Sequence, residues 1–188
     1  MRIALTKVCD DTHRLALIRG DGRHETVELA SHSFLWHDFL HYAVETNARL
    51  HESFWGLLAS GRTLAELHDA MGGDGAGPSG EAMITEAVVG VMTNVVRQDI
   101  PAGAAIEGLG RLFQAQGRAM PIWFTADFVE RAREPMRRLA GEWRALPYGG
   151  EMQLAFPAAE AAQTKARPEI GAGSRTKDRK SIAYLISV

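Results

Sequence analysis

The chain has 188 residues, of which 46% are hydrophobic and 23% are charged, and this balance fits one globular domain of ordinary size. Its formal net charge of -2 argues against a general attraction to nucleic acid or to anionic membranes. Cys9 is the single cysteine, which excludes an internal disulfide and any zinc or iron–sulfur site built from several cysteines.

The amino-terminal segment carries no targeting signal that we can identify. Its apolar run is too short for a signal peptide, and no stretch of the chain approaches the ~20 uninterrupted apolar residues of a membrane-spanning helix. We therefore expect a cytoplasmic protein that binds neither membranes nor nucleic acid. Self-association into a homo-oligomer stays open at this point.

Residues 1–29 alternate apolar and polar side chains in the manner of β-strands. Two such runs flank Asp21-Gly22, which favours a tight hairpin because Asp-Gly turns need positive φ at their centre. We expect an antiparallel meander over residues 1–29. The run "EMQLAF", residues 151–156, alternates in the same way and predicts one more strand that returns to this sheet.

Between these segments the sequence predicts about five helices. Helical periodicity or capping signals mark residues 34–47, 63–72, 81–98, 101–117 and 125–146, and a shorter apolar run over 52–61 ends at a glycine. Thr63 and Glu66 form a capping box, in which each side chain satisfies the other residue's free backbone N–H. Ser33 and Thr125 are predicted to cap the first and last helices, and the last helix is predicted to bend near Pro135.

Periodicity is lost after Pro157. Residues 158–188 contain six Lys or Arg against three Asp or Glu, and their composition is typical of a flexible, disordered tail. The prediction is therefore a single α+β domain over residues 1–157, followed by this tail. In the domain, an antiparallel sheet from the amino-terminal hairpins and the carboxy-terminal strand packs against about five helices on one face.

The stretch "HDFLHYAVE", residues 37–45, concentrates ionisable side chains on one helix. At about 100° per residue, His37, Asp38, His41 and Glu45 share an arc ~100° wide. Two histidines at positions i and i+4 can grip one metal ion, and in the HExxH pattern the residue after the first histidine acts as base. His37 and His41 are thus candidate ligands of a divalent metal such as zinc, and Asp38 and Glu45 are candidate catalytic groups.

Helix geometry limits how many of these residues can hold one ion. The Cα atoms of His37 and Glu45 stand ~12 Å apart, so Glu45 can scarcely reach an ion held by the two imidazoles. We expect Glu45 to hydrogen-bond His41 and orient it instead. A metal site then needs a third ligand from elsewhere, for which His51, His68 or a carboxylate are candidates.

The segments "SFLWHDFLHYAVE" and "SFWGLLASG" follow one another at residues 33–45 and 53–61. Together they resemble a family of bacterial proteins of unassigned function, in which a His-Asp-x-x-His-x-x-x-Glu helix precedes a Gly-Phe-Trp-Gly-Leu stretch. The resemblance covers residues 1 to about 157, with Ser53 at the position where the family has glycine. It implies that the ionisable cluster and the turn at residues 54–56 belong together, and it implies no activity.

Two interpretations of the cluster follow, and we favour the first. In the first, the protein is a small binding or interaction module, and the cluster is a structural polar network in which Asp38 can also pair with an arginine of residues 131–144. In the second, it is a small metal-dependent hydrolytic enzyme with His37 and His41 as ligands and Asp38 or Glu45 as base. A third ligand within reach would favour the enzyme, whereas a cluster sealed by apolar side chains would favour the network.

Overall fold

The computed structural model describes residues 1–72 and 80–157. The predicted tail over residues 158–188 lies outside the described residues. The elements in chain order are β1 (Arg2–Lys7), β2 (Thr12–Ile18), β3 (His24–Ala30), the π-helical segment η1 (Ser31–Leu35), α1 (Trp36–Ala48), α2 (Phe54–Ala59), α3 (Leu64–Gly72), α4 (Gly80–Gln98), α5 (Ala102–Ala115), α6 (Ala126–Ala145) and β4 (Glu151–Ala155). None of the helices described is both long and apolar enough to cross a membrane.

The four described strands form one sheet in the order β3-β2-β1-β4, and every neighbouring pair is antiparallel. This confirms the predicted meander and the strand that returns to it from the carboxy-terminal side. Gly22 has a φ of 84°, as the Asp-Gly turn between β2 and β3 requires. The α+β class is therefore confirmed, with six α-helices among the described residues where about five were expected.

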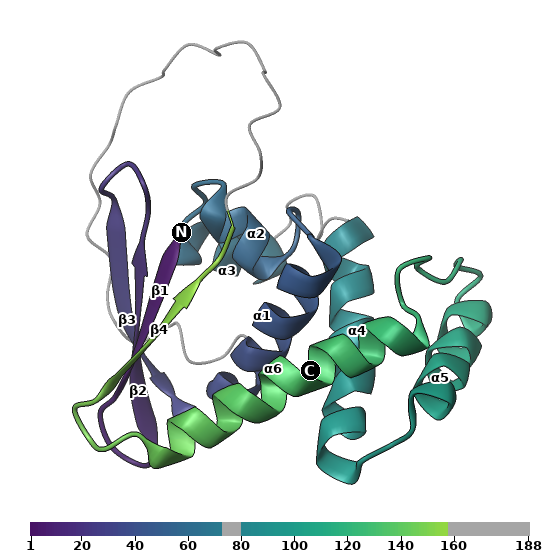
Figure 1. Cartoon of the computed structure of the whole chain (residues 1–188). Helices are drawn as coiled ribbons and strands as arrows, with labels where there is room; N and C mark the ends of the chain where they lie inside the picture. The colour runs from purple at the N-terminus through teal and green to yellow at the C-terminus, as the bar shows by residue number, and fades with distance from the viewer. Residues whose placement is uncertain (73–79, 158–188) are drawn as a thin grey trace, which may run out of the picture.

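Figure 1 shows the helices gathered on one side of the sheet, with α1 between the strands and α4 and with α5 farthest from the strands. The apolar positions of the strands point toward these helices, and Ile3, Leu5, Leu15 and Leu17 are almost completely buried. Burial of each such side chain contributes about 1.5–3 kcal/mol to stability. Because α1 is surrounded by other elements, three of its polar residues, Asp38, His41 and Glu45, are buried along with most of its apolar ones.

Helix starts follow the predicted capping chemistry at two places and differ at a third. Thr63 and Glu66 exchange the two hydrogen bonds of a capping box, and Thr125 Oγ1 accepts the N–H of Phe128. Ser33 instead lies inside η1, because the chain passes from β3 into η1 and directly on into α1, so the backbone is already helical before α1 begins. Helix α6 continues through Pro135 without a break.

Candidate functional site

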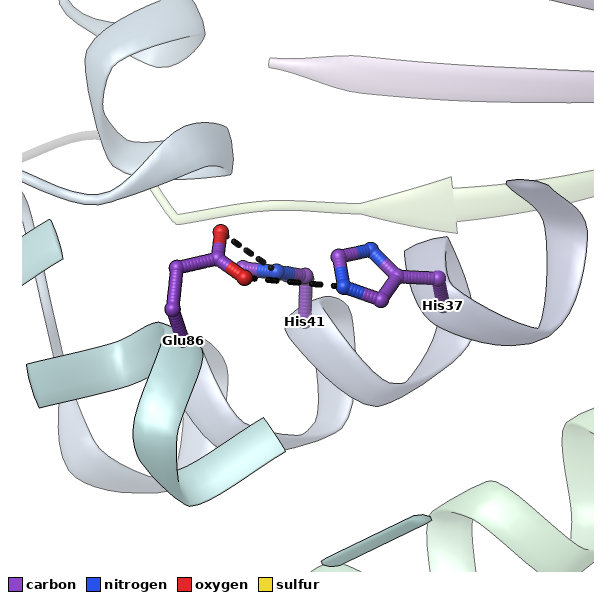
Figure 2. Close-up of side chains that lie close together, drawn as sticks. All are labelled: His37, His41 and Glu86. Atoms are coloured by element: carbon purple, nitrogen blue, oxygen red, sulfur yellow. Dashed lines mark ion pairs between the residues drawn. The ribbon is translucent and has the colours of Figure 1, made fainter. Parts of the chain in front are cut away.

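Glu86 on α4 joins the two histidines of α1 in one cluster. Its carboxylate oxygens lie 3.2 Å from His41 Nε2 and 3.6 Å from His37 Nε2. Figure 2 shows the carboxylate reaching across from α4 toward the two imidazole rings, whose centroids are 4.5 Å apart. One ligand atom from each residue lies within 4.8 Å of the others. His37, His41 and Glu86 are hereafter called the His-His-Glu cluster.

His41 is also held by a hydrogen bond at its other ring nitrogen, Nδ1. Its Nδ1 lies 2.9 Å from Glu45 Oε1, so Glu45 orients His41 as the helical spacing predicted. Glu45 Oε2 accepts the backbone N–H groups of Trp55 and Gly56 at 2.9 and 3.0 Å. These N–H groups belong to the first turn of α2, where no carbonyl of the helix can accept them. The structure thus joins the ionisable cluster to the turn at residues 54–56.

The close approach of α2 to the segment before it depends on a glycine. A Cβ atom on Gly56 would stand 2.6 Å from the backbone of His51. Any larger residue would therefore push the backbone away at the point where it donates to Glu45. This explains why the residue at position 56, beside the cluster, is a glycine.

The imidazolium of His41 and the carboxylates of Glu45 and Glu86 stabilise one another's charged forms. Burial disfavours the imidazolium form of His41, but hydrogen bonds to Glu45 and Glu86 and their negative charges outweigh it and raise the pKa of His41 to about 10. Partial burial of Glu86 is likewise outweighed by the two imidazoles, which lower the pKa of its carboxyl below the usual range. Burial raises the pKa of Glu45, against the opposing effects of His41 and the two backbone N–H groups.

Protonated His41 is therefore placed between two carboxylates when no metal is bound. A divalent cation would occupy the side of His41 on which Nε2 carries its proton, and would meet Glu86 and His37 there. Ligand atoms around a tetrahedral zinc stand roughly 3.3 Å apart, because zinc–ligand bonds are ~2.0–2.1 Å long. The ligand atoms of the cluster lie within 4.8 Å of one another, so the three side chains would have to draw closer together around an ion.

Asp38 is buried next to this cluster and has an unusual environment. Its Oδ2 has no hydrogen-bond partner among the described residues, and it forms no ion pair there with the arginines of α6. Burial raises the pKa of Asp38 to about 7, although the charge of His41 opposes the shift. Glu45 is buried with its oxygens engaged by His41, Trp55 and Gly56. Catalytic roles for Asp38 and Glu45 remain predictions.

The residue that the structure brings beside His37 and His41 is a carboxylate, Glu86, which the sequence did not single out. His51 lies outside the cluster, where its backbone N–H donates to Glu81 Oε1, and the side chain of His68 is not in the described part of the chain. Glu86 carries a signal that could have found it: it is the only charged residue between Glu81 and Arg97 on a helix with an apolar face. A lone carboxylate in such a run is a candidate for a partnered or functional group.

The cluster is open to solvent on one side. The side chains of Glu86 and His37 are 46% and 29% exposed, whereas that of His41 is 3% exposed. If these three side chains held a tetrahedral ion, its fourth position would be free, which is the arrangement of catalytic rather than structural zinc sites. The cluster is therefore not sealed by apolar side chains.

No protein-family model matches the chain, and no match was found among curated proteins or solved structures.

Proposed function

We propose that the protein is a metal-dependent enzyme of hydrolytic type, in which His37, His41 and Glu86 hold one divalent ion, with zinc as the first candidate. The observation that carries the proposal is the position of Glu86, whose oxygens lie 3.2 and 3.6 Å from the Nε2 atoms of His41 and His37. A third candidate ligand within reach is the feature that we expected to favour the enzyme over the structural network. An ion held in this way supplies a Lewis acid that activates water for attack on an ester, amide or phosphoester.

The surrounding residues have the roles that such a site needs. Glu45 accepts the Nδ1 proton of His41, so the Nε2 atom of that ring is directed toward Glu86. Glu45 is itself held by the N–H groups of Trp55 and Gly56, which limits its movement. Glu86 comes from another helix than the histidines, so the ligand set forms only when α1 and α4 are packed together.

A structural network is the second candidate, and one observation favours it. The nitrogens of His41 are within hydrogen-bond distance of Glu45 and Glu86, so the buried imidazolium is satisfied without a metal. In that case the protein is an interaction module, and the cluster serves to join α1, α2 and α4. Removing one partner would then destabilise the fold, because a buried charge would be left unpaired.

Metal content distinguishes the two candidates. Protein purified without a histidine tag is stripped on a chelating resin, and zinc and ferrous iron are each titrated by calorimetry, since ferrous iron also accepts two histidines and one carboxylate. We expect one ion per chain. We expect Glu86→Gln and His37→Gln each to weaken binding by at least about 100-fold, because the loss of an outer hydrogen-bond partner alone typically costs 10–100-fold.

Glu107→Gln on α5 is the matched control, because Glu107 is exposed and pairs only with Arg111 in the described part of the chain. Its zinc affinity should equal that of the unaltered protein. Hydrolysis is tested with a chromogenic ester and a chromogenic phosphodiester, and turnover should require the metal and be lost in Glu86→Gln. Absence of stoichiometric metal, or equal affinity in Glu86→Gln and Glu107→Gln, would support the structural network instead.

A further inference from the structure

A cavity of about 490 Å³ lies where η1, α1 and α6 meet, and we propose that it binds a small organic anion made of a carboxylate on an aromatic or branched apolar body. This goes beyond the proposed function, because the cavity is on another side of α1 from the His-His-Glu cluster. Phe39, which lines the cavity, is about 200° around the helix from His37. The volume of the cavity is within the roughly 300–1,000 Å³ of small-molecule sites.

The walls of the cavity are mostly apolar and aromatic. Leu35, Trp36, Phe39, Val96 and Trp143 supply them. The indole of Trp143 is held by edge-on contacts with Phe39 and His13, at ring-centroid distances of 6.3 and 6.0 Å. Because these contacts fix the ring, this wall is formed before any ligand arrives, which lowers the entropic cost of binding. An apolar body with a ring fits such walls.

The polar groups favour a negative charge on that body. Arg137 and Arg144 of α6 line the cavity two helical turns apart. Arg137 is already bonded to Asp99 at 2.6 Å. Arg144 donates from Nε to the carbonyl of Ala140 in its own helix, and no carboxylate pairs with it among the residues described. Its terminal N–H groups thus remain available, and a carboxylate is the partner that a guanidinium binds with two hydrogen bonds.

Each of the two acidic groups near the cavity has one hydrogen-bond partner. Asp10 lines the cavity, but its Oδ1 accepts the hydroxyl of Tyr148 at 2.6 Å. Asp11 is 2.6 Å from Nε2 of His32, which also lines the cavity. Nε1 of Trp36 also lacks an acceptor in the described ranges, but it has no exposed surface through which a ligand could reach it. Arg144 is therefore the donor at the cavity that the acceptor oxygens of an anionic ligand can reach.

The backbone at the cavity is unusual as well. Ser31, His32 and Leu35 of η1 are all lining residues, and η1 is π-helical. Such segments are rare in proteins and are frequent at functional sites, because their wider turn displaces side chains from the positions that a regular helix would give them.

The test uses the full chain freed of metal on a chelating resin, so that it is independent of the His-His-Glu cluster. The probe is 3-phenylpropionate, and 3-phenylpropan-1-ol is its uncharged counterpart. The chain has four tryptophans, whose indole N–H signals are resolved in a ¹⁵N–¹H spectrum. We expect 3-phenylpropionate to shift the signals of Trp36 and Trp143 in a saturable way and to leave those of Trp55 and Trp123 in place.

Arg144→Gln should weaken binding of 3-phenylpropionate about 10-fold or more and leave binding of the alcohol unchanged, because only the acid bonds to the guanidinium. Arg138→Gln is the matched control on the same helix, since Arg138 pairs with Glu142 and does not line the cavity. The residues changed are exposed, so both variants should fold.

Three results would each overturn the proposal. They are the absence of a saturable shift at Trp36 and Trp143, equal shifts at all four indoles, and equal affinity of Arg144→Gln and Arg138→Gln for the acid. The metal-binding proposal would be untouched by any of them, because these measurements are made without metal. Conversely, failure of the zinc titration would leave this cavity and its test unchanged.

Discussion

Replacing Gly56 with alanine tests whether α2 holds the cluster in place through its backbone. The added methyl carbon would stand 2.6 Å from the Cα, carbonyl carbon and oxygen of His51, none of which can rotate away as a side chain could. The backbone at residue 56 must shift, and its N–H, which donates to Glu45 Oε2 at 3.0 Å, must shift with it.

The magnitude follows from two effects at this position. Forcing extra volume into a packed site typically costs about 1–3 kcal/mol, and loss of a hydrogen bond to a charged group costs about 1.5–3 kcal/mol. The two are coupled, because one backbone shift produces both, so we expect a decrease of about 2–4 kcal/mol in the free energy of unfolding. Zinc affinity should fall about 10–100-fold as well, since Glu45 would no longer hold His41 in one orientation.

The measurements are urea denaturation of metal-free protein and calorimetric titration with zinc. Gly90→Ala is the control, because Gly90 lies inside α4 and an added Cβ would have nothing within 4 Å. That change should stabilise the protein by about 0.5–1 kcal/mol, as alanine is the better helix former. An unfolding midpoint for Gly56→Ala equal to that of the unaltered protein would refute the reasoning.

Three further predictions concern the sheet. His13 is 0% exposed, and burial lowers its pKa to about 4. The unfolded chain therefore binds more protons than the folded chain between pH 6.5 and 4, so the free energy of unfolding should decrease as the pH falls through that range. We expect this decrease to be up to about 3 kcal/mol larger than in His13→Gln, as denaturation at a series of pH values would measure. Gly22→Val should cost about 1 kcal/mol or more, because valine disfavours a φ of 84°, and an unchanged urea midpoint would contradict this. Arg19 is buried and donates to Glu25 and to two backbone carbonyl groups; Arg19→Met should cost about 3–5 kcal/mol in the same assay, whereas Arg14→Met at an exposed ion pair should cost no more than about 1 kcal/mol.

The sequence alone determined much of the sheet and of the helix starts. Alternation in residues 2–7 and 12–18, and the Asp-Gly turn before β3, predicted strands that the structure contains. The Thr63–Glu66 capping box is found as expected. These features could be predicted because their causes are local: side-chain period, turn conformation and capping depend on residues a few positions apart. The helical spacing likewise predicted that Glu45 would hold His41.

Only the tertiary structure decided which residue completes the cluster. Glu86 follows His41 by 45 positions and sits on another helix, so its approach depends on how α1 and α4 are rotated and offset against each other. Side-chain packing across the whole core sets that rotation and offset, and no local sequence pattern near either residue predicts them. The same holds for the burial of Asp38 and for the cavity beside Trp143, which exist only because α6 crosses the start of α1. The placing of His37, His41 and Glu45 on one face of a helix follows from nine consecutive residues. The contact of the two histidines with Glu86 depends on elements far apart in the chain.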